Sequence, residues 1–147
     1  WDMPTVEVKS TKGKRREYNL RAIWDLLHGF TACSGVFVVL EEVHASPPQR
    51  PGAAIAAGSV ATTNFRLGEC RGLLRMALVA LDLAHERVAP QTWKKRMLEQ
   101  RGGTKGDSLE RARELFPLCA AQLRAKSHDG RAEALLLAEY GRRVIGG

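Results

Sequence analysis

Two acidic residues stand four positions apart at the start of an alanine- and leucine-rich segment near the end of the chain. Asp129 and Glu133 belong to the stretch HDGRAEALLLAEYG, residues 128–141. A spacing of four places both side chains on one face of a helix, close enough to share a divalent cation. Acidic residues in a first helical turn also complement the helix dipole without any ligand. The spacing alone therefore leaves a metal site and a simple helix start both open.

A third carboxylate, Glu41, ends the apolar run GVFVVLEEVH, residues 35–44. Such a run is typical of a strand buried on both faces, and ligand sites of α/β sheets lie at the carboxyl ends of strands. A carboxylate there needs a cation or hydrogen-bond donors to offset its desolvation. Three oxygen ligands would suit Mg²⁺ or Mn²⁺, which support phosphodiester hydrolysis. Glu42 is not an expected ligand, because alternation along a strand turns it to the opposite face.

The chain of 147 residues suits a single domain, and 23 Lys and Arg against 16 Asp and Glu give a net charge of +7. This excess favours a polyanionic partner, nucleic acid before acidic membrane, with an inert basic surface as the alternative. The separated Cys33, Cys70 and Cys119 predict reduced, mostly buried thiols and disfavour zinc. No apolar run reaches the roughly 18 residues of a spanning helix, and no leader is recognisable, so we expect an intracellular protein.

Strands and helices alternate along the sequence, which predicts an α/β fold with a mixed sheet flanked by helices. Breaker residues over 45–63 predict a long loop before an apolar helix over 64–84. The other expected elements are a strand at 5–10 with a basic turn after it, a helix from Asn19 to Phe30, a strand at 35–44, a short strand at 86–90, a helix at 91–98, a basic loop at 99–107, a helix at 108–116 and a last helix from Asp129.

An aromatic residue beside cations, as in Trp93 followed by Lys94 and Lys95, is able to stack on and clamp nucleic acid. We expect Trp93 in the core, and Lys94 and Lys95 against a nucleic-acid backbone. His44 and His128 stand beside the acidic residues and have the chemistry of proton carriers or phosphate contacts. We favour structural roles for both, with His128 at the start of the last helix.

Six short motifs stand in an order that resembles the RuvC-like Holliday junction resolvases, including the plastid members of that family. The resemblance covers almost the whole chain. The closing helix and PQTWKK with the TK pair are fairly specific together, whereas LGECRG alone is weak. The motifs are LEEVH at 40–44, LGECRG at 67–72, VAPQTWKK at 88–95, TKGDS at 104–108, ARELFP at 112–117 and DGRAEALLLAEYG at 129–141.

The resemblance implies an RNase H-like fold, a homodimer, and a Mg²⁺-dependent enzyme that resolves four-way DNA junctions by paired nicks in recombination and repair. Mn²⁺ is the alternative ion. By motif, Glu41 matches a catalytic strand-end glutamate, and Asp129 and Glu133 match an acidic pair, which makes all three metal ligands. Lys105 matches a catalytic basic residue near the scissile phosphate, with a mobile loop lysine as the alternative. The expected DNA contacts are Lys94, Lys95 and Lys105, with Lys12, Lys14 and Arg15 of the basic turn.

The sequence departs from the family pattern at two points. The family opens with a strand that bears an Asp in a GIDP-like motif, whereas this sequence begins at Trp1 and Asp2 matches a later position. We therefore expect 1–147 to be an N-terminally incomplete RNase H-like nuclease domain without one metal ligand, and with residues 36–40 short of a neighbouring strand. At position 133, Glu stands where Asp is common, so metal binding is expected with altered geometry.

The leading hypothesis is a metal-dependent, structure-selective endodeoxyribonuclease acting on branched DNA. A junction-binding or architectural module that does not cut is the main alternative. A nuclease of RNA:DNA hybrids is a third. The expected setting is a bacterial or viral cytoplasm or nucleoid, or alternatively a plastid or mitochondrial nucleoid, without a membrane partner.

Overall fold

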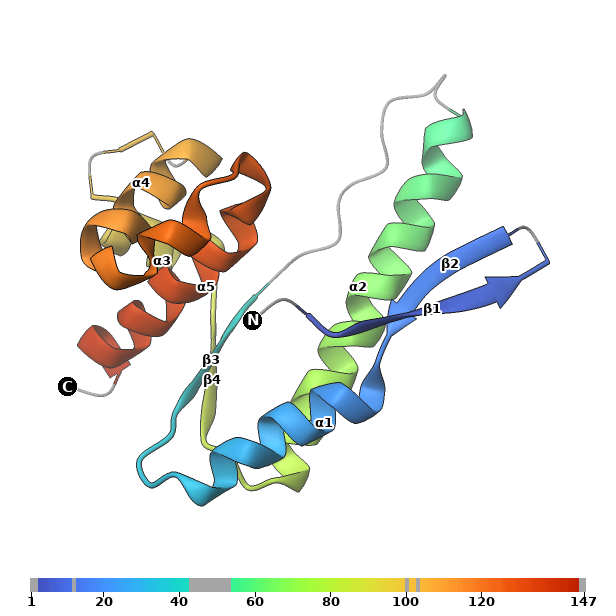
Figure 1. Ribbon diagram of the computed structural model, residues 1–147, viewed down its shortest axis with the longest axis horizontal. Coiled ribbons are helices and arrows are strands. Elements are labelled where there is room, and N and C mark those ends of the chain that lie inside the picture. Colours follow the sequence, from blue (N-terminus) through green and yellow to red (C-terminus); the bar gives the residue numbers. More distant parts are fainter. Residues whose placement is uncertain (1–2, 12, 43–53, 100, 103, 146–147) are drawn as a thin grey trace. The chain divides into compact units, whose positions relative to one another are not determined.

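The structure is a computed structural model that describes residues 3–11, 13–42, 54–99, 101–102 and 104–145 (Figure 1). These residues divide into two compact units. We call residues 3–36 and 54–84 the hairpin unit, and residues 37–42 and 85–145 the helical unit. Each unit is described by itself, and whether the chain forms the expected single domain stays a prediction.

The hairpin unit begins with strands β1 (Thr5–Ser10) and β2 (Gly13–Tyr18), which pair antiparallel. Their register runs from Thr5 opposite Tyr18 to Ser10 opposite Gly13. Gly13 has a φ of +115°, a conformation that glycine adopts without a steric penalty. The expected strand and basic turn are thus a hairpin, and the turn residues continue directly into the second strand.

Helix α1 (Leu20–Gly29) has the boundaries that its sequence predicts. The Asn19 side chain caps it by accepting a hydrogen bond from the backbone N–H of Ala22 at 3.1 Å. Its apolar face is only partly core, because Ile23 is buried whereas Leu20 and Trp24 are exposed. A short 3₁₀ turn, η1 (Phe30–Ala32), follows the helix.

Helix α2 (Ala54–Ala80) is longer than expected, because residues 54–63 are helical and were predicted as part of a loop. The alanine-rich stretch AIAAGSVATT outweighs its single glycine, since alanine has the highest intrinsic helix propensity. The expected loop before residue 54 lies outside the described residues. Cys70 and Leu78 of α2 are buried, whereas Phe65, Met76 and Val79 are exposed, so this helix is not buried along its length.

The helical unit contains a second small sheet, in which β3 (Val38–Glu41) runs parallel to β4 (His85–Val88). The register places Glu41 opposite Val88, and the backbone N–H of Glu42 donates to the Val88 carbonyl at 2.7 Å. Helices α3 (Pro90–Met97), α4 (Lys105–Leu115) and α5 (Asp129–Tyr140) follow. Three shorter helical segments complete the unit: η2 (Pro117–Leu123), η3 (Lys126–His128) and η4 (Gly141–Ile145), the last a π-helix.

The core of the helical unit forms where these helices meet β4. Trp93, Leu98, Ala112 and Leu136 are at most 1% exposed, which confirms Trp93 as a core residue. The end of α5 lies against β3, because a Cβ added at Gly141 would come within 2.5 Å of Val39 Cγ2. This close approach fixes the strand that carries Glu41 against the helix that begins with Asp129.

The α/β class is confirmed, as are the short strand at β4, the helix at α3 and the start of the last helix. The described strands form two separate two-stranded sheets, one antiparallel and one parallel, in place of one mixed sheet. All three cysteines are free, as expected, but Cys33 is exposed and Cys119 half-buried, so only Cys70 is a buried thiol. No helix in the described part of the chain combines the length and apolar character needed to cross a membrane.

Candidate functional site

Glu41 ends β3 and is held by a buried aromatic residue. The indole Nε1 of Trp93 donates a hydrogen bond to Glu41 Oε1 at 2.9 Å. Glu42 pairs instead with Arg87 of β4, with 3.5 Å between Oε1 and Nη1. The two glutamates thus have different partners, as alternation along the strand predicts.

Glu133, one turn into α5, forms an ion pair with Lys94 of α3, with 2.7 Å between Oε1 and Nζ. Both side chains are partly buried, at 27% and 30% exposure. The same Nζ lies 5.3 Å from the centre of the Trp93 ring, within the range of a cation–π interaction. Lys94 therefore contacts both Glu133 and Trp93, and Trp93 in turn donates to Glu41.

Asp129 forms an ion pair with Lys105, with 2.6 Å between Oδ2 and Nζ. The hydrogen bond from Lys105 holds the pKa of Asp129 below its usual range, and the same bond raises the pKa of Lys105. Glu133 also raises the pKa of Lys105 through its charge. Asp129 and Lys105 are thus charged at neutral pH, and this one ammonium group interacts with both Asp129 and Glu133.

Lys105 is the first residue of α4, not a loop residue as predicted. Thr104 caps the helix: its hydroxyl oxygen accepts from the Asp107 N–H at 3.2 Å, and the Asp107 carboxylate accepts from the Thr104 N–H at 2.8 Å. This reciprocal arrangement is a capping box. Sequence reasoning missed it, although the T-K-G-D spacing carries the signal. The cap places Lys105 at a defined position beside Asp129.

The residues from Glu41 to Asp129 form one continuous series of acids and donors. Trp93 and Lys94 link Glu41 to Glu133, and Lys105 interacts with Glu133 and Asp129. Four elements contribute to this series, namely β3, α3, α4 and α5 (Figure 1). The structure thereby brings the three predicted acids and two predicted lysines into one network.

The three acids of the network have the right chemistry for a metal ion, but their arrangement differs from that of a metal site. Three carboxylates have the chemistry that Mg²⁺ and Mn²⁺ prefer. Among the described residues, however, no three acidic, histidine or cysteine side chains form a group that could hold a metal ion. Each of the three acids contacts a donor of the chain itself instead. The residues thus fit a hard cation in chemistry, and their arrangement is not that of a formed three-ligand site.

The other predicted DNA contacts lie outside this network. Lys95 is exposed, and with Arg96 and Tyr140 it lines a shallow groove of about 290 Å³ in the helical unit. Lys14 and Arg15 lie on β2 of the hairpin unit, where they pair with Glu7 and Glu17 respectively. Lys12 lies outside the described residues.

The two candidate histidines have different outcomes. His44 lies outside the described residues. His128 directly precedes α5, as predicted, but its side chain makes no capping hydrogen bond. Its Nδ1 is buried without a partner among the described residues. His128 thus has the predicted position at the start of α5, but its side chain does not stabilise that start through a hydrogen bond.

Comparison with known proteins adds nothing to this geometry. No protein-family model matches the chain, and a search of curated proteins found no match.

Proposed function

We propose that the protein is a metal-dependent, structure-selective endodeoxyribonuclease that resolves four-way DNA junctions, with an RNase H-like arrangement of its strands and helices. The observation that supports it is the network of Glu41, Glu133 and Asp129 with Lys94 and Lys105. Three acids gathered from a strand end and one helix are the residue types that such chemistry needs. The net charge of +7 suits a DNA partner.

In this proposal Glu41, Asp129 and Glu133 hold Mg²⁺ or Mn²⁺. The bound ion would supply an activated water and a stabilised leaving oxygen. Lys105 is the proposed phosphate partner, and this role is supported by its ion pair with Asp129 and by a raised pKa, which keeps the ammonium group protonated. Trp93 orients Glu41 through its indole N–H. Two coordinated nicks need two active sites, so the proposal includes a homodimer.

The test is nicking of a labelled four-way junction and of a linear duplex of matched sequence, with Mg²⁺ or with EDTA. Glu41→Gln keeps the size of the side chain and removes its charge. Glu86→Gln is the matched control, because Glu86 lies exposed on the neighbouring strand β4. The proposal expects Mg²⁺-dependent cutting of the junction that Glu41→Gln abolishes and Glu86→Gln preserves.

The resembled family has a further Asp on an N-terminal strand, so the assay is repeated with a version extended at its N-terminus by such a strand. Mg²⁺-dependent cutting of the junction by the extended version, lost in its Glu41→Gln variant, also supports the proposal. Tight binding of the junction without cutting by either version contradicts it.

A junction-binding module that does not cut is the second candidate, and one specific observation favours it. Each of the three acids already contacts a donor of the chain, and the described residues contain no three-ligand group. In such a module Lys94 and Lys105 would hold the acidic pair as structural ion pairs. Binding of the junction with equal affinity in Mg²⁺ and EDTA, without nicks, is the result that this candidate expects.

A further inference from the structure

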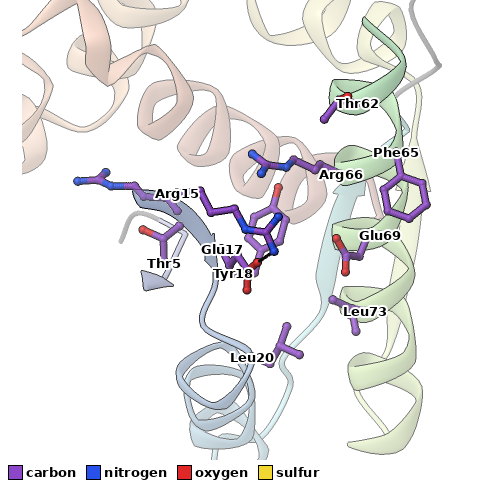
Figure 2. A pocket seen from close by; sticks show the side chains of 11 residues that line it. Thr5, Arg15, Glu17, Tyr18, Leu20, Thr62, Phe65, Arg66, Glu69 and Leu73 are labelled. Carbon is purple, nitrogen blue, oxygen red and sulfur yellow. Dashed lines mark ion pairs between the residues drawn. The ribbon is translucent and has the colours of Figure 1, made fainter. Parts of the chain in front are cut away.

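A groove in the hairpin unit lies apart from the acidic network. It opens between β2 and α2 and has a volume of about 550 Å³ (Figure 2). Its lining includes Arg15, Arg16 and Arg66 together with Glu17 and Glu69. Three guanidinium groups against two carboxylates give the groove a positive balance.

Tyr18, on β2, lines the groove, and the buried Cys70, on α2, is close enough to it to influence its pKa. Burial raises the pKa of both groups, so both stay protonated at neutral pH. Next to the groove, β2 and α2 thus bring together two groups that are uncharged at neutral pH.

The three arginines of the groove differ in what they contact. Arg15 forms an ion pair with Glu17, drawn as a dashed line in Figure 2. Arg16 and Arg66 form no ion pair with any described carboxylate, although both are exposed. Figure 2 shows the Arg66 side chain reaching from α2 toward the hairpin. Two guanidinium groups thus have no ion pair with a described carboxylate, and with Glu69 in the same lining the groove keeps an excess of one positive charge, which suits an anionic ligand.

Apolar side chains stand directly beside these cations. Phe65 is 74% exposed on α2, one position before Arg66, and Leu20 and Leu73 also line the groove with exposed surface. A free phosphate ion would use the arginines and leave this apolar surface in water. A strand of nucleic acid uses both, because its phosphates meet the cations while its bases stack on exposed aromatic rings.

We infer that this groove binds an unpaired DNA strand, with phosphates at Arg16 and Arg66 and a base against Phe65. The choice of DNA over another polyanion rests on the proposed function. A protein that acts on branched DNA meets unpaired or unstacked nucleotides where the arms cross, and a stacking groove accepts them without reading their sequence. The groove adds a strand-binding site to a protein whose proposed catalytic residues lie in the other unit.

The test measures binding of a fluorescein-labelled single-stranded oligodeoxynucleotide to the full chain by fluorescence anisotropy in EDTA. The groove variant is Arg16→Gln with Arg66→Gln. The control is Lys9→Gln with Arg75→Gln, which also removes one exposed cation from the hairpin and one from α2, neither of which lines the groove. Circular dichroism confirms that both variants fold.

The groove variant is expected to bind about tenfold or more weakly and to lower the slope of log affinity against log salt by about 1.4, since two phosphate contacts on a single strand are lost. The control should change affinity less than about twofold. Phe65→Ala should weaken binding about fivefold or more with the salt slope unchanged, because it removes stacking and no charge.

Three results overturn the inference. The first is an equal loss of oligonucleotide affinity in the groove and control variants, which would mean that the whole basic surface attracts DNA without a specific site. The second is competition by an acidic polypeptide as strong as that by DNA of the same charge, which would assign the groove to a protein partner. The third is no measurable binding of the oligonucleotide. Glu41→Gln separates this inference from the proposed function, because it should stop junction cutting and leave oligonucleotide binding unchanged.

Discussion

The indole N–H of Trp93 points at the carboxylate of Glu41 across 2.9 Å, so a buried core residue and a candidate catalytic residue are positioned by one hydrogen bond. The Trp93 ring is fully buried, which fixes its N–H in place. The position of Glu41 therefore depends on packing inside the helical unit as well as on the strand that carries it.

Replacing Trp93 by Phe removes this N–H and leaves a small cavity. We expect the free energy of unfolding to fall by about 2 to 4 kcal/mol, measured by urea denaturation. Trp24→Phe is the control, because Trp24 is 38% exposed on α1, and it should cost less than about 0.5 kcal/mol. Similar losses in both variants would contradict the role of Trp93.

The two glycines of α5 and its extension should respond in opposite directions. Gly141→Ala places a methyl group within 2.5 Å of Val39 and should destabilise the fold by about 1 to 3 kcal/mol. Gly130→Ala meets no atom within 4 Å and should stabilise the helix by up to about 1 kcal/mol. Thermal unfolding of the two variants distinguishes them. A neutral Gly141→Ala would show that β3 does not lie against α5 in solution.

Removing the α4 cap should loosen the helix that begins with Lys105. Thr104→Ala deletes the hydroxyl that accepts from the Asp107 N–H, and it should cost about 1 kcal/mol of stability in urea unfolding. Ser127→Ala is the control, because Ser127 is exposed on η3 and provides no cap. If the two variants are equally stable, the capping box does not hold this helix end.

Glu139 gives the fold a defined acid sensitivity. Hydrogen bonds from Arg142 and Arg143 lower its pKa from 4.5 to about 2. The unfolded chain thus binds this proton more readily, so the stabilising contribution is complete above pH 4.5 and is lost as the pH falls toward 2. Glu139→Gln should be less stable than the parent by about 1 to 2 kcal/mol at pH 6, after allowance for solvent screening, and equal to it near pH 2.

Urea unfolding between pH 6 and pH 2 measures this difference. Glu110→Gln is the control, because Glu110 is 69% exposed and lies 4.0 Å from Arg101. The free energy of unfolding of Glu110→Gln should differ from that of the parent chain by the same amount at every pH between 6 and 2. If the difference in free energy of unfolding between Glu139→Gln and the parent chain does not change with pH, the pKa of Glu139 is not lowered in the folded protein.

Lys105 competes with any cation for Asp129. Lys105→Gln should therefore bind Mn²⁺ about two- to fivefold more tightly, measured by calorimetry, while cutting junction DNA more slowly because the phosphate partner is gone. Lys126→Gln, an exposed lysine of η3, should change neither quantity. Weaker Mn²⁺ binding by Lys105→Gln would contradict the competition.

The elements that the sequence predicts well are those with strong local signals. Asn19 and the apolar spacing after it define α1, and the apolar stretch that begins at Asp129 defines α5. The scattered breaker residues predict a loop over 54–63, whereas the helix propensity of alanine makes this stretch helical. The basic stretch at 99–107 predicts a loop around Lys105, whereas the capping box of Thr104 and Asp107 starts a helix there.

The partners within the candidate site have no local signal at all. Lys94 and Glu133 are 39 residues apart, and their ion pair depends on how α3 packs against α5. Sequence patterns identified both residues as candidates without indicating that they bind each other. Arg66 of the groove was missed for the same reason, since only the fold brings α2 beside β2.

The hydrogen bond between Trp93 and Glu41 spans 52 residues of sequence, whereas α3, α4 and α5 are neighbours along the chain. Closing so long a loop costs more chain entropy than packing adjacent helices. Helix α5, which carries Asp129 and Glu133, is therefore expected to pack against α4 early in folding, and β3 to add to it late. Asp129, Glu133 and Lys105 would then come together before Glu41 joins them.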